Sequence, residues 1–257
     1  GMSEPVLKAE HLGITFGGLK AVSDFNMTIN SGELVGLIGP NGAGKTTVFN
    51  LLTNVYQPTR GSILIDGMPT AGKKTYQVNR MGVARTFQNI RLFRSLSVLD
   101  NVLIAKHMRA KHNVFTATFR LTPKVEREMQ QSAIALLEEQ GLSHLKDEVA
   151  GSLPYGAQRR LEIVRALATN PSLLLLDEPA AGMNPSETQE LMENIVKIRD
   201  TFGIAIMLIE HDMSLVMNIC EGICVLNFGK VIAKGTPEEI QSNEAVIEAY
   251  LGKQKEA

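Results

Sequence analysis

Strand-like and helix-like patterns of apolar residues alternate along the chain. Apolar and polar residues alternate over 25–29, just before a turn, which predicts a strand. Bare apolar runs at 34–38, 173–176 and 204–209 are typical of parallel strands that are covered on both faces. A shorter strand, followed by Asp-Gly, is predicted at 62–65. These segments predict a mostly parallel sheet.

Helices are predicted between these strands. One begins at Lys45 and stops before Pro58, with apolar residues at helical spacing: Val48, Leu51, Leu52 and Val55. Asn184, followed by a proline and three residues on by a glutamate, is a helix start with a capping box. Thr236 repeats this signal for the last helix, and residues 90–157 carry mostly helical patterns. Alternating strands and helices predict an α/β fold with right-handed crossovers.

A glycine-rich segment joins the strand at 34–38 to the helix that begins at Lys45. Residues 39–46 read Gly-Pro-Asn-Gly-Ala-Gly-Lys-Thr, which fits the phosphate-binding loop pattern. Glycines let successive backbone N–H groups point at phosphate oxygens, and the helix adds its positive N-terminal end. Lys45 is predicted to reach the β and γ phosphates, and Thr46 to give its hydroxyl to Mg²⁺. The loop predicts a site for a nucleoside triphosphate.

The apolar run at 173–176 ends in two adjacent carboxylates, Asp177 and Glu178. Carboxylates at the end of a buried strand are costly unless a cation or a catalytic task holds them there. We expect Asp177 to serve Mg²⁺, commonly through water, and Glu178 to orient or deprotonate a water that attacks the γ phosphate. The phosphate-binding loop turns this otherwise weak signal into a strong one.

The composition is that of an ordinary globular protein, with 44% hydrophobic and 21% charged residues. It excludes disordered, collagen-like and disulfide-scaffold classes. The net charge is −1, but residues 67–125 hold eleven of the 26 Lys and Arg residues and one acid, Asp100. Such a basic segment predicts either a solvated face or a surface that meets something negative, nucleic acid or the cytoplasmic membrane face with its proteins.

Neither membrane spans nor a secretory leader are evident in the sequence. No apolar stretch approaches the roughly 18 residues that a span requires, and the N-terminus lacks a basic region followed by an apolar one. We therefore expect a cytoplasmic chain. Cys220 and Cys224 match no zinc spacing, and we expect buried thiols rather than a redox pair.

Together the motifs resemble the nucleotide-binding subunit of an ATP-binding cassette (ABC) transporter, in the family's order over nearly the whole chain. The resemblance implies that Gln88 is the Q-loop glutamine, which touches Mg²⁺ and the attacking water. It implies that His211 is the switch histidine at the γ phosphate, and that Phe16 stacks on adenine. Singly, each has an ordinary interpretation as a solvated, capping or core side chain. Their joint order favours the functional one.

The resemblance also specifies a nucleotide site with ATP and Mg²⁺ as its ligands. Glu178, His211 and Gln88 are the implied catalytic residues, and Thr46, Gln88 and Asp177 are the implied metal ligands. The implied nucleotide contacts are Phe16, Gly39, Asn41, Gly42, Ala43, Gly44, Lys45, Thr46, Thr47, Tyr155 and Gly156.

The segment 152–160 stands where the family has its signature, Leu-Ser-Gly-Gly-Gln, and departs from it. Gly156 keeps a small residue at the helix start, so backbone N–H groups can approach a γ phosphate held by a partner subunit. Pro154 replaces the serine whose hydroxyl usually donates to that phosphate, and Ala157 replaces the glutamine. We therefore expect a weakened signature half-site. Asn184 takes the aspartate position of the family's D-loop.

The implied fold is an α/β P-loop NTPase with a mostly parallel core sheet, an N-terminal antiparallel β subdomain and an inserted helical subdomain. Residues 2–257 are expected to form one ABC ATPase domain. Its nucleotide-binding core is expected over 2–89 and 158–257, and its helical subdomain over 90–157, with the signature at the end of that subdomain.

Four segments look most like ATPases of branched-chain or related amino-acid importers: 14–18, 85–89, 180–185 and 249–252. Such ATPases act with transmembrane permease subunits, a second ATPase subunit as homodimer or sister heterodimer, and indirectly a solute-binding protein. The resemblance places the chain peripherally on the cytoplasmic face of the inner membrane. Lipopolysaccharide-export ATPases are the runner-up, and urea importers are a third candidate.

Two other classes fit less well. A non-transport cassette ATPase acting on ribosomes or DNA usually has two cassettes or long coiled-coil arms, and 5% aromatic residues without Trp give little material for base stacking. No nucleic-acid partner is therefore expected. A kinase explains neither Gly156 at a helix start nor His211 after a strand. For a transporter motor, the basic segment 67–125 is expected to face the membrane partner, with Phe115 and Phe119 extending that contact.

Overall fold

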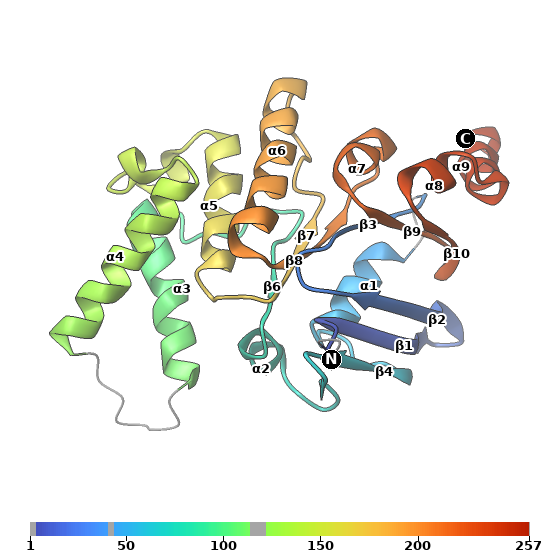
Figure 1. Cartoon of the computed structure of the whole chain (residues 1–257), viewed down its shortest axis with the longest axis horizontal. Coiled ribbons are helices and arrows are strands. Elements are labelled where there is room, and N and C mark those ends of the chain that lie inside the picture. Colours follow the sequence, from blue (N-terminus) through green and yellow to red (C-terminus); the bar gives the residue numbers. More distant parts are fainter. Residues whose placement is uncertain (1–3, 41–43, 114–121, 257) are drawn as a thin grey trace.

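The architecture comes from a computed structural model that describes residues 4–40, 44–113 and 122–256. Within these residues the chain forms a six-stranded sheet, a four-stranded sheet and helices around them (Figure 1). No helix of the described part is long and apolar enough to cross a bilayer.

The six-stranded sheet is mostly parallel, as predicted. Its order is β10–β9–β3–β8–β7–β6, and each neighbouring pair is parallel except β9 with β10, which is antiparallel. The strands are β3 (Leu34–Ile38), β6 (Val83–Arg85), β7 (Leu173–Asp177), β8 (Ala205–Ile209), β9 (Gly222–Asn227) and β10 (Lys230–Gly235). The three apolar runs of the sequence are thus neighbouring central strands, because only a strand covered on both faces can be apolar throughout.

Alternate residues of the central strands enter two different apolar cores. One core holds Leu173, Leu175 and Met207 and packs against α1 (Lys45–Leu52) and the four-stranded sheet. The other holds Leu174 and Leu208 and packs against helices on the opposite face. Those helices are α5 (Tyr155–Leu167), α6 (Pro185–Phe202), α7 (Met213–Ile219), α8 (Pro237–Gln241) and α9 (Glu244–Glu256).

The four-stranded sheet is antiparallel and lies mostly near the N-terminus, as the resemblance implies. Its order is β2–β1–β4–β5. The strands are β1 (Leu7–Phe16), β2 (Leu19–Ile29), β4 (Arg60–Ile65) and β5 (Met68–Pro69). The predicted strands at 25–29 and 62–65 are parts of β2 and β4, and α2 (Thr75–Arg80) follows this sheet.

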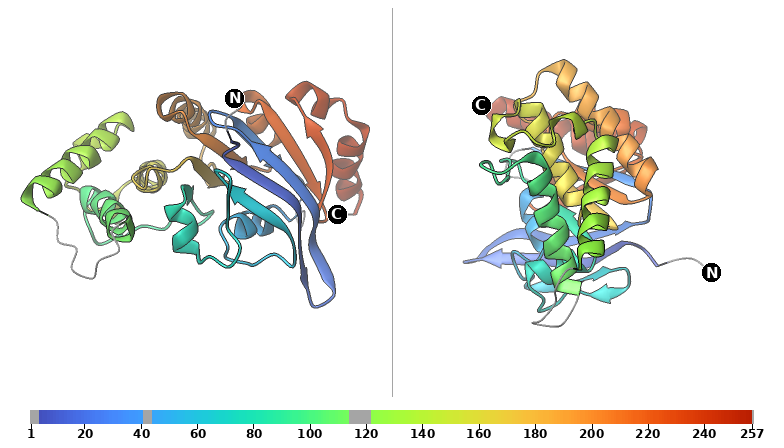
Figure 2. Two further views of the ribbon diagram at one scale, coloured as in Figure 1. Left: turned by 60° about the horizontal axis from the view of Figure 1, so that its bottom comes forward. Right: turned by 90° about the vertical axis from the view of Figure 1, so that its left-hand side faces the viewer.

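A helical lobe is inserted between β6 and β7. It contains α3 (Val98–Asn113) and α4 (Pro123–Glu139), which lie side by side at one end of the molecule, and they pack on α5 (Figures 1 and 2). The lobe has an apolar core of its own, which includes Val102, Leu137 and Leu161. Two 3-10 turns, Ser143–Leu145 and Ala150–Ser152, connect α4 to α5. Helix α5 joins the two parts because its residues enter both the lobe core and a core of the main sheet.

Two helix boundaries differ from the prediction. Helix α1 ends at Leu52, because Asn54 takes a left-handed backbone conformation with φ 55°, and Val55 is exposed rather than packed. Thr236 caps the short helix α8 and not the last helix, since α9 follows it.

The cysteine prediction is confirmed. Cys220 and Cys224 are buried free thiols, and burial raises the pKa of each to about 12.

Candidate functional site

The phosphate-binding loop lies between β3 and α1. Gly44 has φ 98°, and a Cβ there would lie 3.1 Å from the carbonyl oxygen of Ala21, so this position favours glycine. The Lys45 side chain is buried, and its Nζ donates to the carbonyl oxygen of Gly39 at 2.8 Å. The ammonium thus adds positive charge next to Gly39, the first residue of the loop. The predicted contacts Asn41, Gly42 and Ala43 lie outside the described residues.

A cavity of about 470 Å³ lies at the N-terminal end of α1, and the three predicted metal ligands line it. Thr46 from α1, Asp177 from the end of β7 and Gln88 from the loop after β6 all line it. Thr47 is half-buried on the first turn of α1 and does not line this cavity. Three segments that are far apart in the sequence therefore meet at the carboxyl edge of the parallel sheet, where α/β proteins place their ligands.

Asp177 is a buried carboxylate with cations around it. Arg85 Nη2 lies 3.7 Å from Asp177 Oδ2, and Arg85 also donates to Asn50 Oδ1 at 2.7 Å. Burial raises the pKa of Asp177, while Arg85 and Lys45 act to lower it. Burial lowers the pKa of the Arg85 guanidinium as well. A further cation in the cavity would favour the ionised Asp177.

The donor set of this cavity fits Mg²⁺ bound to a nucleotide. Within the described residues no group of three or more His, Cys, Asp or Glu side chains could hold a metal ion alone. Mg²⁺ in nucleotide sites is usually held by one or two carboxylates together with substrate phosphates and waters. One carboxylate, one hydroxyl and one amide beside a phosphate-binding loop supply the protein's share of such a site.

Glu178 and His211 form a pair beside this cavity. Glu178 Oε1 lies 2.8 Å from His211 Nδ1, and the histidine side chain is more than half exposed. Glu178 has φ 47°, a left-handed conformation that is unusual for a residue with a side chain. Its neighbour Asp177 pairs with Arg85 while Glu178 pairs with His211. The two adjacent carboxylates thus have different partners.

Phe16 lies at the end of β1. It is exposed, and its ring forms an edge-to-face pair with Tyr56. The ring centroids are 5.2 Å apart and the planes meet at 72°. Phe16 is 44% exposed, so part of its surface is accessible to a ligand. Tyr56 was not predicted, and the sequence around it gives only a turn after a helix.

The signature segment forms the start of α5. Pro154 is the N-cap residue, and its side chain makes no capping hydrogen bond. A Cβ on Gly156 would lie 3.0 Å from Glu187 Oε2, so the glycine gives α5 a close approach to α6. The Tyr155 hydroxyl donates to the carbonyl oxygen of Ala181 at 2.9 Å. Tyr155 therefore ties the signature to the segment that stands in the D-loop position.

Arg159 is a buried cation that joins the signature helix to the Q-loop. Its side chain is fully buried, and it donates to the carbonyl oxygens of Phe87 at 2.6 Å and Gln88 at 2.7 Å. It also pairs with Glu162 at 2.8 Å and donates to the Tyr155 hydroxyl at 3.3 Å. Gln88 is exposed and lines the cavity, while Arg159 holds its backbone carbonyl oxygen.

A second cavity, of about 490 Å³, shares Arg85, Phe87 and Arg91 with the first. The Arg85 and Arg91 guanidiniums both lie over the Phe87 ring, with their central carbons 4.5 and 3.5 Å from its centroid. Arg109 and Arg165 also line this cavity, and burial lowers the pKa of both. The basic segment 67–125 is therefore not only a solvated face. Phe115 and Phe119 lie outside the described residues.

Three buried charges of the site were not predicted from the sequence: Arg85, Arg159 and Glu210. Arg159 and Glu162 stand three apart in an otherwise apolar helix face, which is a weak signal of a buried pair. Glu210 follows the apolar run of β8, the same signal that identified Asp177 at the end of β7.

A parallel sheet with a phosphate-binding loop at its edge and an inserted helical lobe defines an ATP-binding cassette ATPase. The family model "ABC transporter" matches residues 22–181, and the model "Branched-chain amino acid ATP-binding cassette transporter" matches residues 230–256. The chain belongs to the ABC transporter family.

Relatives match over almost the whole chain. It is 48% identical to the high-affinity branched-chain amino acid transport ATP-binding proteins BraF of Pseudomonas aeruginosa and LivG of Escherichia coli, over 98% of this chain and 99% of each relative. It is 36% identical to the lipopolysaccharide export system ATP-binding protein LptB of Haemophilus influenzae, over 97% of this chain and 98% of that protein.

Solved structures show the same fold. The ADP conformation of MJ1267, an ATP-binding cassette of an ABC transporter, has a TM-score of 0.84 at 29% identity and covers 98% of this chain and all of that chain. CbiO1 of Clostridium perfringens, part of the ABC transporter complex cbiONQ, has a TM-score of 0.81 at 29% identity, over 96% of this chain and 94% of that one. The fold class predicted from the sequence is confirmed.

Proposed function

We propose that this chain is the ATP-hydrolysing motor of an importer for branched-chain or related amino acids. One observation supports ATP hydrolysis above all. Thr46, Gln88 and Asp177 line one cavity, beside Lys45 and the Glu178–His211 pair. The substrate class is supported by the 48% identity to BraF and LivG, which exceeds the 36% identity to LptB.

The proposed reaction is hydrolysis of the γ phosphate of ATP. A water attacks the γ phosphorus, the bond to the bridging β–γ oxygen breaks, and ADP and inorganic phosphate leave. Glu178 accepts the proton of the water or orients it, and His211 holds the Glu178 carboxylate and contacts the γ phosphate. Lys45 supplies positive charge to the β and γ phosphates. Mg²⁺ bound with Thr46, Asp177 and Gln88 would neutralise phosphate charge.

The loop residues and one aromatic residue complete the proposed nucleotide site. We propose that backbone N–H groups of the phosphate-binding loop contact the phosphates, and that Phe16 stacks on adenine. The loop contacts are Gly39, Asn41, Gly42, Ala43, Gly44 and Thr47. The partial exposure of Phe16 supports this role.

The proposed motor works as a pair of ATPase subunits, either two copies or a sister pair. Tyr155 and Gly156 at the start of α5 would then face a nucleotide held by the partner subunit. In support, Pro154 leaves the first N–H groups of α5 without a side-chain cap. Residues 2–89 and 158–257 are the proposed nucleotide-binding core, and 90–157 the proposed helical subdomain.

The proposed docking face for the transmembrane permeases is the cavity beside Phe87. It combines the exposed side chains of Tyr76 and Met108 with the guanidiniums of Arg91 and Arg109. Apolar anchors beside charge suit a helix of a membrane protein that carries acidic residues. The chain would thereby sit peripherally on the cytoplasmic face of the inner membrane, with a solute-binding protein as an indirect partner.

A trapping experiment tests this function. Glu178→Gln should bind ATP without hydrolysing it, so that complexes with the variant accumulate. We expect two permease subunits and an ATPase subunit to be recovered with it from native membranes and identified by mass spectrometry. The matched control adds Lys45→Ala, which should remove ATP binding and ATP-dependent recovery.

The companions decide between the candidate functions. Permeases that support uptake of radiolabelled leucine only when the wild-type chain is present would establish the importer. Recovery of lipopolysaccharide-transport proteins would replace it with the exporter, and permeases specific for urea would replace the substrate. Ribosomes or DNA factors without membrane proteins would overturn the transport function.

A further inference from the structure

The turn that carries Glu178 is conformationally unusual. Glu178 is not glycine but has φ 47°, and such a residue persists only where its surroundings determine the backbone. The turn continues with a hydrogen bond from the Ala181 N–H to the Glu178 carbonyl oxygen at 3.1 Å. Whatever fixes this turn fixes the direction in which Glu178 points.

Three consecutive residues at the end of β8 hold the turn. The carbonyl oxygen of Ile209 accepts from the Glu178 N–H at 2.9 Å, and His211 contacts the Glu178 side chain at 2.8 Å. Between them, Glu210 Oε1 accepts from the Ala180 N–H at 3.1 Å. One strand end therefore holds the backbone and side chain of Glu178 and also the backbone two residues later.

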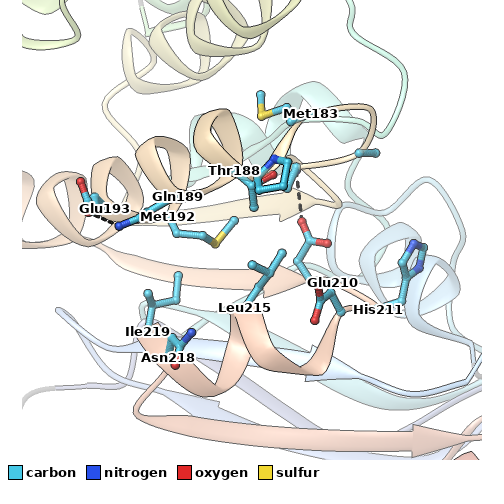
Figure 3. A pocket seen from close by; sticks show the side chains of 14 residues that line it. Met183, Thr188, Gln189, Met192, Glu193, Glu210, His211, Leu215, Asn218 and Ile219 are labelled. Carbon is cyan, nitrogen blue, oxygen red and sulfur yellow. Dashed lines mark hydrogen bonds between the residues drawn. The ribbon is translucent and has the colours of Figure 1, made fainter.

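Glu210 lies at the wall of a cavity of about 730 Å³ between α6 and α7. Its side chain is directed towards the loop before α6, as Figure 3 shows, while His211 extends away from it. Glu210 is 3% exposed, and burial raises its pKa to about 7. Glu178 and Asp212 also raise it, whereas the Ala180 N–H and Lys45 lower it. An uncharged oxygen in place of the Glu210 carboxylate would accept from the Ala180 N–H without the cost of burying a charge.

We propose that Glu210 is a positioning residue for ATP hydrolysis: it holds the Ala180 amide and so fixes the turn that directs Glu178 and begins the D-loop segment. This inference rests on the role proposed above for Glu178. The same contact bears on the D-loop, because the Ala180 carbonyl oxygen accepts from the Met183 N–H at 3.1 Å. Glu210 thus links the position of Glu178 to that of the segment that Tyr155 contacts through Ala181.

Three variants test this role. Glu210→Met keeps the size of the side chain but removes the acceptor, and Glu210→Gln keeps an amide oxygen that can accept from Ala180. Glu193→Met is the matched control, because Glu193 is an exposed acid on the wall of the same cavity. Each is compared with the wild-type full-length chain, first without nucleotide by hydrogen exchange of residues 178–184 and then by ATPase kinetics.

We expect Glu210→Met to speed exchange of the Ala180 amide at least about tenfold, since its acceptor is lost. We expect kcat to fall by about tenfold to a hundredfold, with the KM for ATP within about twofold, because misplacing Glu178 affects the transition state more than nucleotide binding. Glu210→Gln should recover most of both quantities, and Glu193→Met should leave both unchanged.

The inference is overturned if Glu210→Met leaves the exchange of Ala180 and kcat unchanged, if Glu210→Gln fails as completely as Glu210→Met, or if Glu193→Met matches Glu210→Met. Exchange is measured without nucleotide, so it tests the anchor separately from the reaction. A wild-type chain that binds no ATP would instead overturn the proposed function, and would leave the exchange result as evidence on the anchor alone.

Discussion

Arg159 of the signature helix donates to the backbone carbonyl oxygen of Gln88 at 2.7 Å, although the two residues are 71 positions apart. The same guanidinium pairs with Glu162 and contacts the Tyr155 hydroxyl, which in turn donates to Ala181. The Q-loop, the start of α5 and the D-loop segment are therefore joined within one subunit. A displacement of the Q-loop by a docked partner would be transmitted to the start of α5 and to the D-loop segment.

Arg159→Met should therefore destabilise the fold strongly. The substitution leaves the buried Glu162 without its cation and two carbonyl oxygens without a donor, which typically costs about 3–5 kcal/mol of the free energy of unfolding. Urea denaturation measures this. The double variant Arg159→Met with Glu162→Met should recover part of the loss, because no unpaired charge remains buried. Additive losses in the double variant would contradict this explanation.

Gly36→Ala should show that α7 packs directly on β3. A Cβ at this position would lie 2.2 Å from Val216 Cγ1 and 3.2 Å from Cys220 Sγ. Overpacking of this kind costs about 1–3 kcal/mol, and it should lower Tm by several degrees. Adding Val216→Ala, which removes the clashing methyl groups, should restore part of Tm. A wild-type Tm for Gly36→Ala would show that the helix moves away freely.

Local signals in the sequence predicted the elements well where a short segment decides its own structure. The Asn184 capping box is confirmed, since Asn184 Oδ1 accepts from the Glu187 N–H at 2.8 Å. The apolar runs form neighbouring central strands, because strands that are apolar throughout are covered on both faces. The predicted end of α1 was wrong. The helical spacing of apolar residues continues to Val55, but Asn54 adopts a left-handed conformation, which a hydropathy pattern does not reveal.

The candidate site was predictable where a motif lies in one short stretch, as at Lys45 and at Asp177 with Glu178. Contacts between distant segments were not. Glu210 meets Ala180 across 30 positions, and Arg159 meets Gln88 only because α5 packs behind the Q-loop. No local pattern specifies such a pair, since its geometry depends on how the helical lobe packs against the sheet.

Glu210→Gln should change how stability depends on pH. The folded pKa of Glu210 is about 7, against an ordinary value of 4.5, so the folded state binds this proton more tightly than the unfolded state. Its contribution is complete below pH 4.5 and is lost as pH rises through 7. Relative to wild type, Glu210→Gln should therefore gain free energy of unfolding between pH 5 and pH 8, by up to about 3 kcal/mol. If urea titrations gave wild type and Glu210→Gln the same dependence of unfolding free energy on pH, the raised pKa of Glu210 would be contradicted.

Pro154→Ser should raise ATP turnover with little change in stability. Proline at the N-cap of α5 offers no hydroxyl, and in the proposed dimer this N-cap faces a phosphate held by the partner subunit. A serine there gains a donor, and a hydrogen bond to a charged group contributes about 1.5–3 kcal/mol, enough for about a tenfold rise in kcat. The serine can cap the helix, which offsets the backbone freedom gained on losing proline. Steady-state ATPase assays should show the rise for Pro154→Ser and none for Pro154→Ala, which removes proline without adding a donor. Equal rates for both variants would mean that proline limits turnover through the backbone and not through the missing hydroxyl.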